Sequence, residues 1–185
     1  MKIYTKKGDD GTTGLLYGGR VAKDDARTSV YGTLDEAVAA MGIARASGLV
    51  QEVEEIVVRL QREMFVVGAQ LATSEENQEK LEEGVSKISP ELTTRAESDI
   101  DRLLERHPLR PEFVLPGETL GAATLDLARS IVRRAERQAV TMARAELIAD
   151  AEILRYLNRI SDLLFALARF EESERGHTAP GSRER

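Results

Sequence analysis

The sequence predicts an all-α protein, an up-and-down bundle of five helices that follows a glycine-rich loop. Apolar residues recur three and four positions apart over most of the chain, which is the period of amphipathic helices. With four Tyr, four Phe, no Trp and 31% charged residues, the composition disfavours a β-sandwich. The 185 residues suffice for one sizeable core, so we expect a single domain over residues 1–172 and a flexible tail over 173–185.

Residues 1–24 are the first expected element, a shaped loop with no helical period. The loop holds five of the 14 glycines, and its central segment is TKKGDDGTTG at residues 5–14. Glycines let a backbone approach an anion closely, hydroxyls donate hydrogen bonds, and lysines neutralise charge. The loop therefore has the composition of a phosphate-binding site, although it lacks the Walker A pattern. An ordinary surface turn is the alternative interpretation.

Two helices are expected next, at residues 25–46 and 50–71. Val30, Leu34 and Val38 belong to the apolar stripe of the first helix. The second has seven apolar residues at alternating spacings of three and four. Such a seam suits a neighbouring helix and would also suit a subunit interface.

A polar connection then leads to a third helix at residues 90–107. Ser89 can cap its free N–H groups, and Pro90 suits its first turn because no donor is lost there. Residues 108–116 hold three prolines, which predict a crossing segment instead of a helix. Phe113, within this segment, would by default be a core residue.

The fourth and fifth helices are expected at residues 118–147 and 149–171, and the last ten residues offer no core-forming side chains. Between positions 129 and 144, the fourth helix has five arginines and one acid, a local net charge of +4 in a chain of −6. At helical spacing, one face carries Arg129, Arg133 and Arg137. Arginines on one face can bind a polyphosphate through paired hydrogen bonds, so we favour an anion site over a solvated basic face.

Polar residues also interrupt the apolar stripe of the fifth helix, at Asn158, Arg159 and Asp162. Polar groups that enter a bundle core need hydrogen-bonding partners or a ligand. A buried hydrogen-bond network is the default interpretation of these three residues. Asp35, in the first helix, would by default belong to an exposed acidic turn.

The composition excludes several functional classes. A net charge of −6 argues against general binding of nucleic acid or anionic membranes. The absence of cysteine excludes disulfides, thiolate metal sites and cysteine nucleophiles, and the two histidines form no Glu-x-x-His metal motif. No apolar run approaches the roughly 20 residues of a membrane span, so we expect a soluble, cytoplasmic protein.

Five ordered motifs, spread over residues 3–169, resemble the PduO-type ATP:cob(I)alamin adenosyltransferases. They are IYTKKGDDGTTGLLYGG, KDD with YGTLDE, FVLPG, RSIVRRAER and YLNRISDLLFALAR. The resemblance implies a homotrimer that transfers the 5′-deoxyadenosyl group of ATP to the cobalt of cob(I)alamin, forming adenosylcobalamin and releasing tripolyphosphate. It also implies that ATP lies at each subunit interface, between the N-terminal loop of one subunit and the arginine helix of its neighbour.

The resemblance further implies roles for individual residues. ATP would be bound by residues of the loop and of two helices: Thr5, Lys6, Lys7, Gly8, Thr13, Gly14, Lys23, Arg133, Arg134, Glu136, Arg137 and Asn158. Arg129 would pair with Asp35 across the interface, and Phe113 would pack against the lower face of the corrin ring. With Arg133, these three form the expected catalytic set, and Mg²⁺ would enter mainly through the ATP phosphates.

Co(I) is a powerful nucleophile, so the implied reaction needs no nucleophilic side chain, in keeping with a chain that lacks cysteine. Three residues depart from the family pattern: Lys7 stands where threonine is common, Glu118 where glycine is usual, and Asp126 where histidine is frequent. A non-catalytic, ATP-sensing bundle and a purely structural oligomer are the alternatives.

Overall fold

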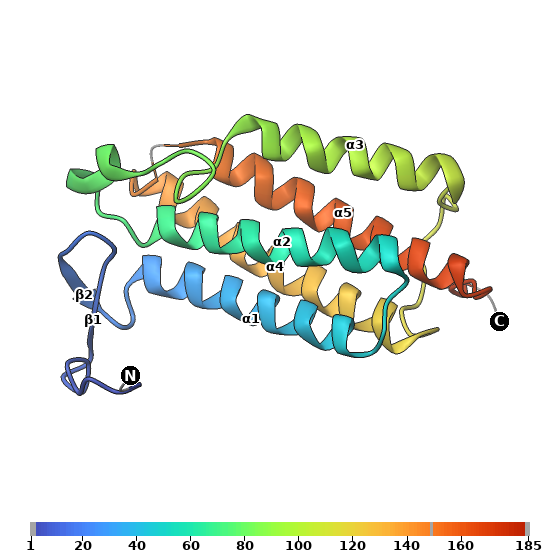
Figure 1. Ribbon diagram of the computed structural model, residues 1–185, viewed down its shortest axis with the longest axis horizontal. Coiled ribbons are helices and arrows are strands. Elements are labelled where there is room, and N and C mark those ends of the chain that lie inside the picture. Colours follow the sequence, from blue (N-terminus) through green and yellow to red (C-terminus); the bar gives the residue numbers. More distant parts are fainter. Residues whose placement is uncertain (1–2, 149, 184–185) are drawn as a thin grey trace.

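The computed structural model describes residues 3–148 and 150–183 and is mostly helical, which confirms the predicted class. Five long helices lie along one another in a bundle (Figure 1). Their bounds are α1 Ala26–Ala46, α2 Gln51–Leu71, α3 Pro90–Arg106, α4 Leu120–Arg144 and α5 Glu152–Glu174. A short 3₁₀ helix, η1 (Glu75–Lys80), lies in the connection between α2 and α3.

The core forms where the apolar faces of the helices meet. α1 packs against α4 and α2, α4 packs against α5, and α5 packs against α3. Leu34, Leu60, Leu125 and Leu164 are among its buried residues, one from each of four helices. The predicted stripes therefore correspond to the faces that are removed from water.

Local capping sets helix ends that differ from the expected ones. The hydroxyl of Thr119 accepts a 3.1 Å hydrogen bond from the N–H of Ala122, so α4 begins after Thr119 instead of at residue 118. The Asp150 carboxylate accepts a 2.9 Å bond from the N–H of Glu152, and α5 starts there instead of at residue 149. At its other end, α5 continues three residues beyond the expected residue 171.

A small hairpin shapes the N-terminal segment, where the sequence predicts a loop. β1 (Thr12–Gly14) pairs with β2 (Arg20–Ala22) in antiparallel register, with Thr13 opposite Val21. The hairpin lies at the end of the bundle where α1 begins (Figure 1). Asp25 connects it to α1 by accepting a 2.8 Å hydrogen bond from the N–H of Arg27.

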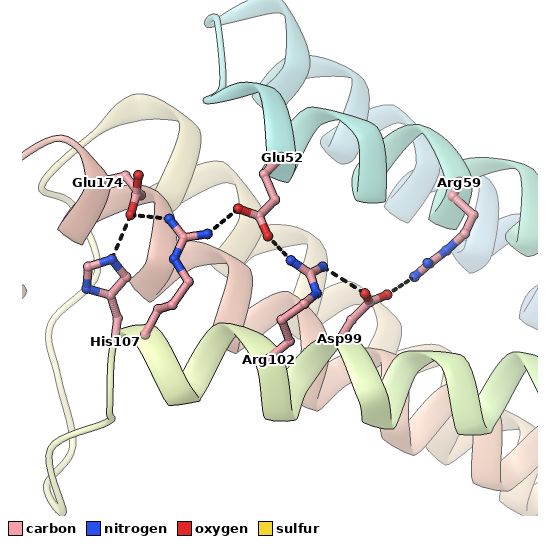
Figure 2. A network of polar contacts seen from close by, with 7 residues as sticks. Glu52, Arg59, Asp99, Arg102, His107 and Glu174 are labelled. Carbon is pink, nitrogen blue, oxygen red and sulfur yellow. Dashed lines mark hydrogen bonds and ion pairs between the residues drawn. The ribbon is translucent and has the colours of Figure 1, made fainter.

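A chain of ion pairs and hydrogen bonds fastens α3 to α2 and α5 (Figure 2). α3 buries only two side chains fully, so its attachment depends partly on these polar contacts. The chain runs in this order: Arg59, Asp99, Arg102, Glu52, Arg106, Glu174 and His107.

The C-terminal residues pack against the connection between α3 and α4. Val114 and Gly181 form an antiparallel bridge, and the side chain of Ala179 is only 3% exposed. The prediction that the last ten residues offer no core-forming side chain is therefore wrong at Ala179. None of the described helices is long and apolar enough to cross a membrane.

Candidate functional site

The N-terminal hairpin presents exposed cations on a tightly turned backbone. Thr5, Lys6, Lys7 and Lys23 are exposed, and Lys6 has a positive φ of 61°, which turns the chain sharply. The N–H of Lys23 donates to the carbonyl of Gly11 at 2.9 Å, which places Lys23 beside the first turn. These ammonium groups are free to meet an anion from solvent.

Gly8 lies in close contact with the backbone of Thr12 and the side chain of Lys23. A Cβ at this position would lie 3.0 Å from the carbonyl oxygen of Thr12 and 3.3 Å from the Cε of Lys23. Thr13 is half-buried on β1, and Gly14 ends that strand. The structure thus brings the predicted loop residues into one small unit.

Arg20 braces this unit, and sequence reasoning missed it. Its guanidinium donates a 2.9 Å hydrogen bond to the hydroxyl of Thr12 and lies 3.6 Å from the Asp10 carboxylate. Hydrogen bonds from the Thr12 hydroxyl and backbone N–H hold the pKa of Asp10 below its usual value. The only sequence signal was a lone arginine after Gly18-Gly19, which does not reveal a cross-strand contact.

The arginines of α4 divide into paired and unpaired groups. Arg134 pairs with Glu36 of α1. Within residues 3–148 and 150–183, the exposed guanidinium groups of Arg133 and Arg137 form no ion pair and no hydrogen bond. Like charges at this spacing repel unless an anion lies nearby. This part of α4 therefore offers donors to an external ligand.

Asn158, Arg159 and Asp162 of α5 lie outside the core, so the default prediction of a buried network is wrong for them. Asn158 and Asp162 are exposed, and Arg159 is half-buried. The amide of Asn158 donates a 2.9 Å hydrogen bond to Glu136 of α4. This contact orients the Asn158 side chain next to the arginine helix.

Arg129 is half-buried at the edge of a charge-balanced cluster between α4 and α5. Its Nε lies 3.6 Å from the Asp126 carboxylate, which also accepts a 2.6 Å hydrogen bond from Arg169. Burial alone would lower the pKa of Arg169, but the contacts with Glu172 and Asp126 outweigh it and raise that pKa. Arg129 and Arg169 both lie over the ring of Phe165. Asp126, one of the departures from the family pattern, thus has a structural partner.

Asp35 and Phe113 are exposed to solvent. Asp35 lies on α1 at the edge of an apolar groove between α1 and α2, whose lining includes Tyr31, Val38 and Phe65. Phe65 is 63% exposed and Phe113 is 85% exposed. Phe113 is therefore not a core residue, contrary to its default interpretation, and sequence reasoning did not identify the groove.

The predicted site residues do not all meet within one chain. Among the described residues, no hydrogen bond or ion pair joins residues 5–23 to Arg133 or Arg137, and none joins Asp35 to Arg129. The hairpin lies at one end of the bundle and the α3–α4 connection at the other, with α4 between them (Figure 1). Within one chain, the predicted site residues are therefore spread along the length of the bundle.

In the part of the chain that the structure describes, acidic and histidine side chains do not gather into a metal site. Within the described ranges, no group of three or more His, Cys, Asp or Glu side chains could hold a metal ion. The loop offers lysines and hydroxyls, which suit phosphate oxygens better than a cation.

The fold and the site together define a class of protein. It is a helical bundle whose exposed cations, on the N-terminal hairpin and on α4, suit a polyanionic ligand. A family model described as cobalamin adenosyltransferase matches residues 3–171. The corrinoid adenosyltransferase of Citrobacter freundii is 40% identical over 172 residues, which cover 93% of this chain and 96% of the relative. That of Bacillus subtilis is 39% identical over 180 residues, with 95% and 89% covered.

Solved structures agree with these sequence matches. A variant PduO-type ATP:corrinoid adenosyltransferase from Lactobacillus reuteri, complexed with cobalamin and ATP, superposes with a TM-score of 0.88 at 32% identity. The match covers 99% of this chain and 97% of that one. The chain belongs to the cobalamin adenosyltransferase family, and its enzymatic class is corrinoid adenosyltransferase.

Proposed function

We propose that this protein transfers the 5′-deoxyadenosyl group of ATP to the cobalt of cob(I)alamin, forming adenosylcobalamin and releasing tripolyphosphate. The observation that carries the proposal is the pair of exposed, unpaired guanidinium groups at Arg133 and Arg137, in the part of the chain that the structure describes. The complex of the Lactobacillus reuteri relative with cobalamin and ATP supports this choice of substrates.

In the proposed step, the cobalt electron pair attacks the ribose 5′ carbon of ATP. A cobalt–carbon bond forms as the carbon–oxygen bond to the triphosphate breaks, and the triphosphate leaves with that electron pair. Negative charge therefore grows on the departing oxygen. Placement of the two substrates and stabilisation of this charge are the contributions left to the protein.

The cations of the chain would supply that stabilisation. Lys6, Lys7 and Lys23 surround the triphosphate in this proposal, with Thr5, Gly8, Thr13 and Gly14 donating from the backbone and hydroxyls. Arg133, Arg134 and Arg137 bind from the α4 face. Glu136 holds Asn158 through the 2.9 Å hydrogen bond, so that the amide faces the nucleotide.

Phe113 would act on the corrin side. Its side chain is 85% exposed on a segment with no helix, so an apolar ligand surface can cover it at no cost to the core. Packed against the lower face of the corrin ring, it would exclude water and a lower cobalt ligand. The resulting four-coordinate cobalt is more easily reduced.

A homotrimer would complete the site in this proposal. The hairpin of one subunit and α4 of its neighbour would bind one ATP, and Arg129 would pair with the neighbour's Asp35. The separation of these residues within one chain and the apolar groove beside Asp35 support this assembly. Mg²⁺ would enter with the phosphates of ATP, since the described residues form no metal site.

The test compares two arginine variants of α4 under anaerobic reduction with cobalamin and Mg-ATP. The wild-type protein should change the corrin absorbance as the cobalt–carbon bond forms. Arg133→Ala should slow this change roughly 100-fold or more, because a transition-state donor is lost. Arg144→Ala, at the end of the same helix, is the charge-matched control and should react normally. If the wild-type protein binds ATP but forms no product, it is an ATP sensor. If it neither binds ATP nor forms product, it is a structural oligomer.

A further inference from the structure

The segment that carries Phe113 has little support from the bundle beneath it. Leu109 is 40% exposed and Leu115 52% exposed, and only Val114 among its apolar neighbours is half-buried. Between this segment and α5 lies a cavity of about 240 Å³, lined by Val114, Phe165 and others. Side-chain packing therefore holds this segment only weakly.

The C-terminal residues supply the missing restraint. The N–H of Leu115 donates a 2.9 Å hydrogen bond to the carbonyl of Pro180, and the N–H of Ser182 donates a 2.7 Å bond to the carbonyl of Phe113. Val114 lies opposite Gly181 between these two bonds. Figure 1 shows the C-terminus at the same end of the bundle as the α3–α4 connection. The two hydrogen bonds thus flank Val114, and one of them holds the backbone of Phe113 itself.

Two further contacts fix where the C-terminal residues lie. The guanidinium of Arg110 donates a 3.0 Å hydrogen bond to the carbonyl of Ala179, whose side chain is buried. A Cβ on Gly181 would overlap the Glu112 carboxylate, so the two segments approach closely here and a larger residue would have to displace that side chain. The register between the two segments is therefore specified and not a loose association.

We propose that residues 179–182 position Phe113 for the corrin ring by pairing with residues 113–115. In an extended segment, successive side chains point to opposite sides. The bridge at Val114 turns that residue toward the cavity and leaves Phe113 directed outward. This role rests on the proposed function, because Phe113 acts only if a corrinoid binds there. Residues 179–182 are positioning residues, and of the two paired segments only Phe113 would touch the corrin ring.

The first test removes one hydrogen bond without removing a side-chain contact. Ser182→Pro lacks the N–H that donates to Phe113, whereas the matched control Ser182→Ala retains it. We expect Ser182→Pro to lower kcat about tenfold, equivalent to about 1.4 kcal/mol. The Kd for ATP should change less than about twofold, and Ser182→Ala should behave as wild type.

A second test removes the strand. Deletion of residues 179–185 should lower kcat at least as much as Ser182→Pro, while deletion of 183–185 keeps the pairing and should not. In a Phe113→Ala background, deletion of 179–185 should add no further loss, because both changes remove the same contact. Helical circular dichroism and the Tm identify any variant that fails to fold.

Hydrogen exchange provides a readout that does not depend on turnover. Deletion of 179–185 should speed exchange at the amide of Leu115, which loses its acceptor. Faster exchange with unchanged kcat would overturn the positioning role and leave the proposed function intact. The positioning role would also be overturned if deletion of 179–185 lowered kcat as much in the Phe113→Ala background as in the wild type. A loss of ATP affinity as large as the loss of kcat would overturn it too. If the wild-type protein forms no cobalt–carbon bond, the proposed function fails instead.

Discussion

Glu63 of α2 is 6% exposed and accepts a 2.5 Å hydrogen bond from the hydroxyl of Tyr156 of α5. Burial raises the pKa of Glu63, although the hydrogen bond from Tyr156 and the charge of Arg59, 3.2 Å away, oppose the rise. The folded protein therefore holds this proton more tightly than the unfolded chain. Stability from this group is full at low pH and is lost as the pH rises through the raised pKa.

Glu63→Gln tests this single residue, since glutamine can accept the Tyr156 hydrogen bond but never ionises. The free energy of unfolding of the variant, relative to wild type, should rise as the pH increases from about 4 to about 7. Denaturant unfolding at several pH values measures it, with the exposed Glu79→Gln as control. A difference that is independent of pH, or that falls with pH, would show that Glu63 does not carry this proton.

For single residues, the sequence predicts which charges share a helix face, but it does not predict which side chains are exposed. Helical spacing places Arg129, Arg133 and Arg137 on one face, and the structure exposes Arg133 and Arg137 but leaves Arg129 half-buried beside Asp126. The sequence places Phe113 in the core by default, since it cannot show that a proline-rich segment runs over a cavity. The sequence predicts a buried network at Asn158 by default. Helical period alone does not show whether a polar residue at the edge of an apolar stripe is buried or exposed.

Of the five long helices, α3 has the fewest buried side chains, and its ionic chain compensates for this. The Asp99 carboxylate, 13% exposed, accepts from Arg59 of α2 at 2.6 Å and from Arg102 at 2.9 Å. At the far end of the chain, a hydrogen bond from His107 holds the pKa of Glu174 below its usual value, with the charge of Arg106 acting in the same direction.

Asp99→Asn should loosen α3 selectively. The change removes a charge that two arginines share, so we expect the free energy of unfolding to fall by about 1–2 kcal/mol. Exchange mass spectrometry should show faster exchange in α3 than in α1 or α4. Asp101→Asn, at an exposed position of the same helix, is the control. Equal effects of the two substitutions would contradict a specific role for the ionic chain.

Among the elements, all five long helices are predictable because apolar residues recur three and four positions apart over several turns of each. The strands of the hairpin have three residues each, too few to show an alternating pattern. The pairing of Val114 with Gly181 joins residues far apart in the sequence, and neither segment has a distinctive composition. Helix starts differ from the predicted ones where Thr119 caps α4 and where the Asp150 carboxylate bonds the first N–H of α5, contacts that period alone does not reveal.

For the whole molecule, the apolar groove between α1 and α2 is the surface that a second copy should cover. We expect a particle about three times the chain mass of 20.4 kDa in sedimentation velocity. Phe65→Glu places a charge in the groove and should dissociate the trimer while the subunit stays folded. Val85→Glu is matched to it, since both side chains are 63% exposed, and should leave the mass unchanged. A monomeric wild-type protein would contradict the assembly.

For the whole molecule at work, we propose that ATP supplies the adenosyl group of a new cobalt–carbon bond. The most direct measurement is an anaerobic incubation of the protein with reduced cobalamin and ATP labelled both in the adenosine and in the γ-phosphate. We predict one adenosine label in the corrinoid and one intact, γ-labelled tripolyphosphate for each turnover. Bound ATP with an unlabelled corrinoid, or release of the γ label as single phosphate, would contradict the account.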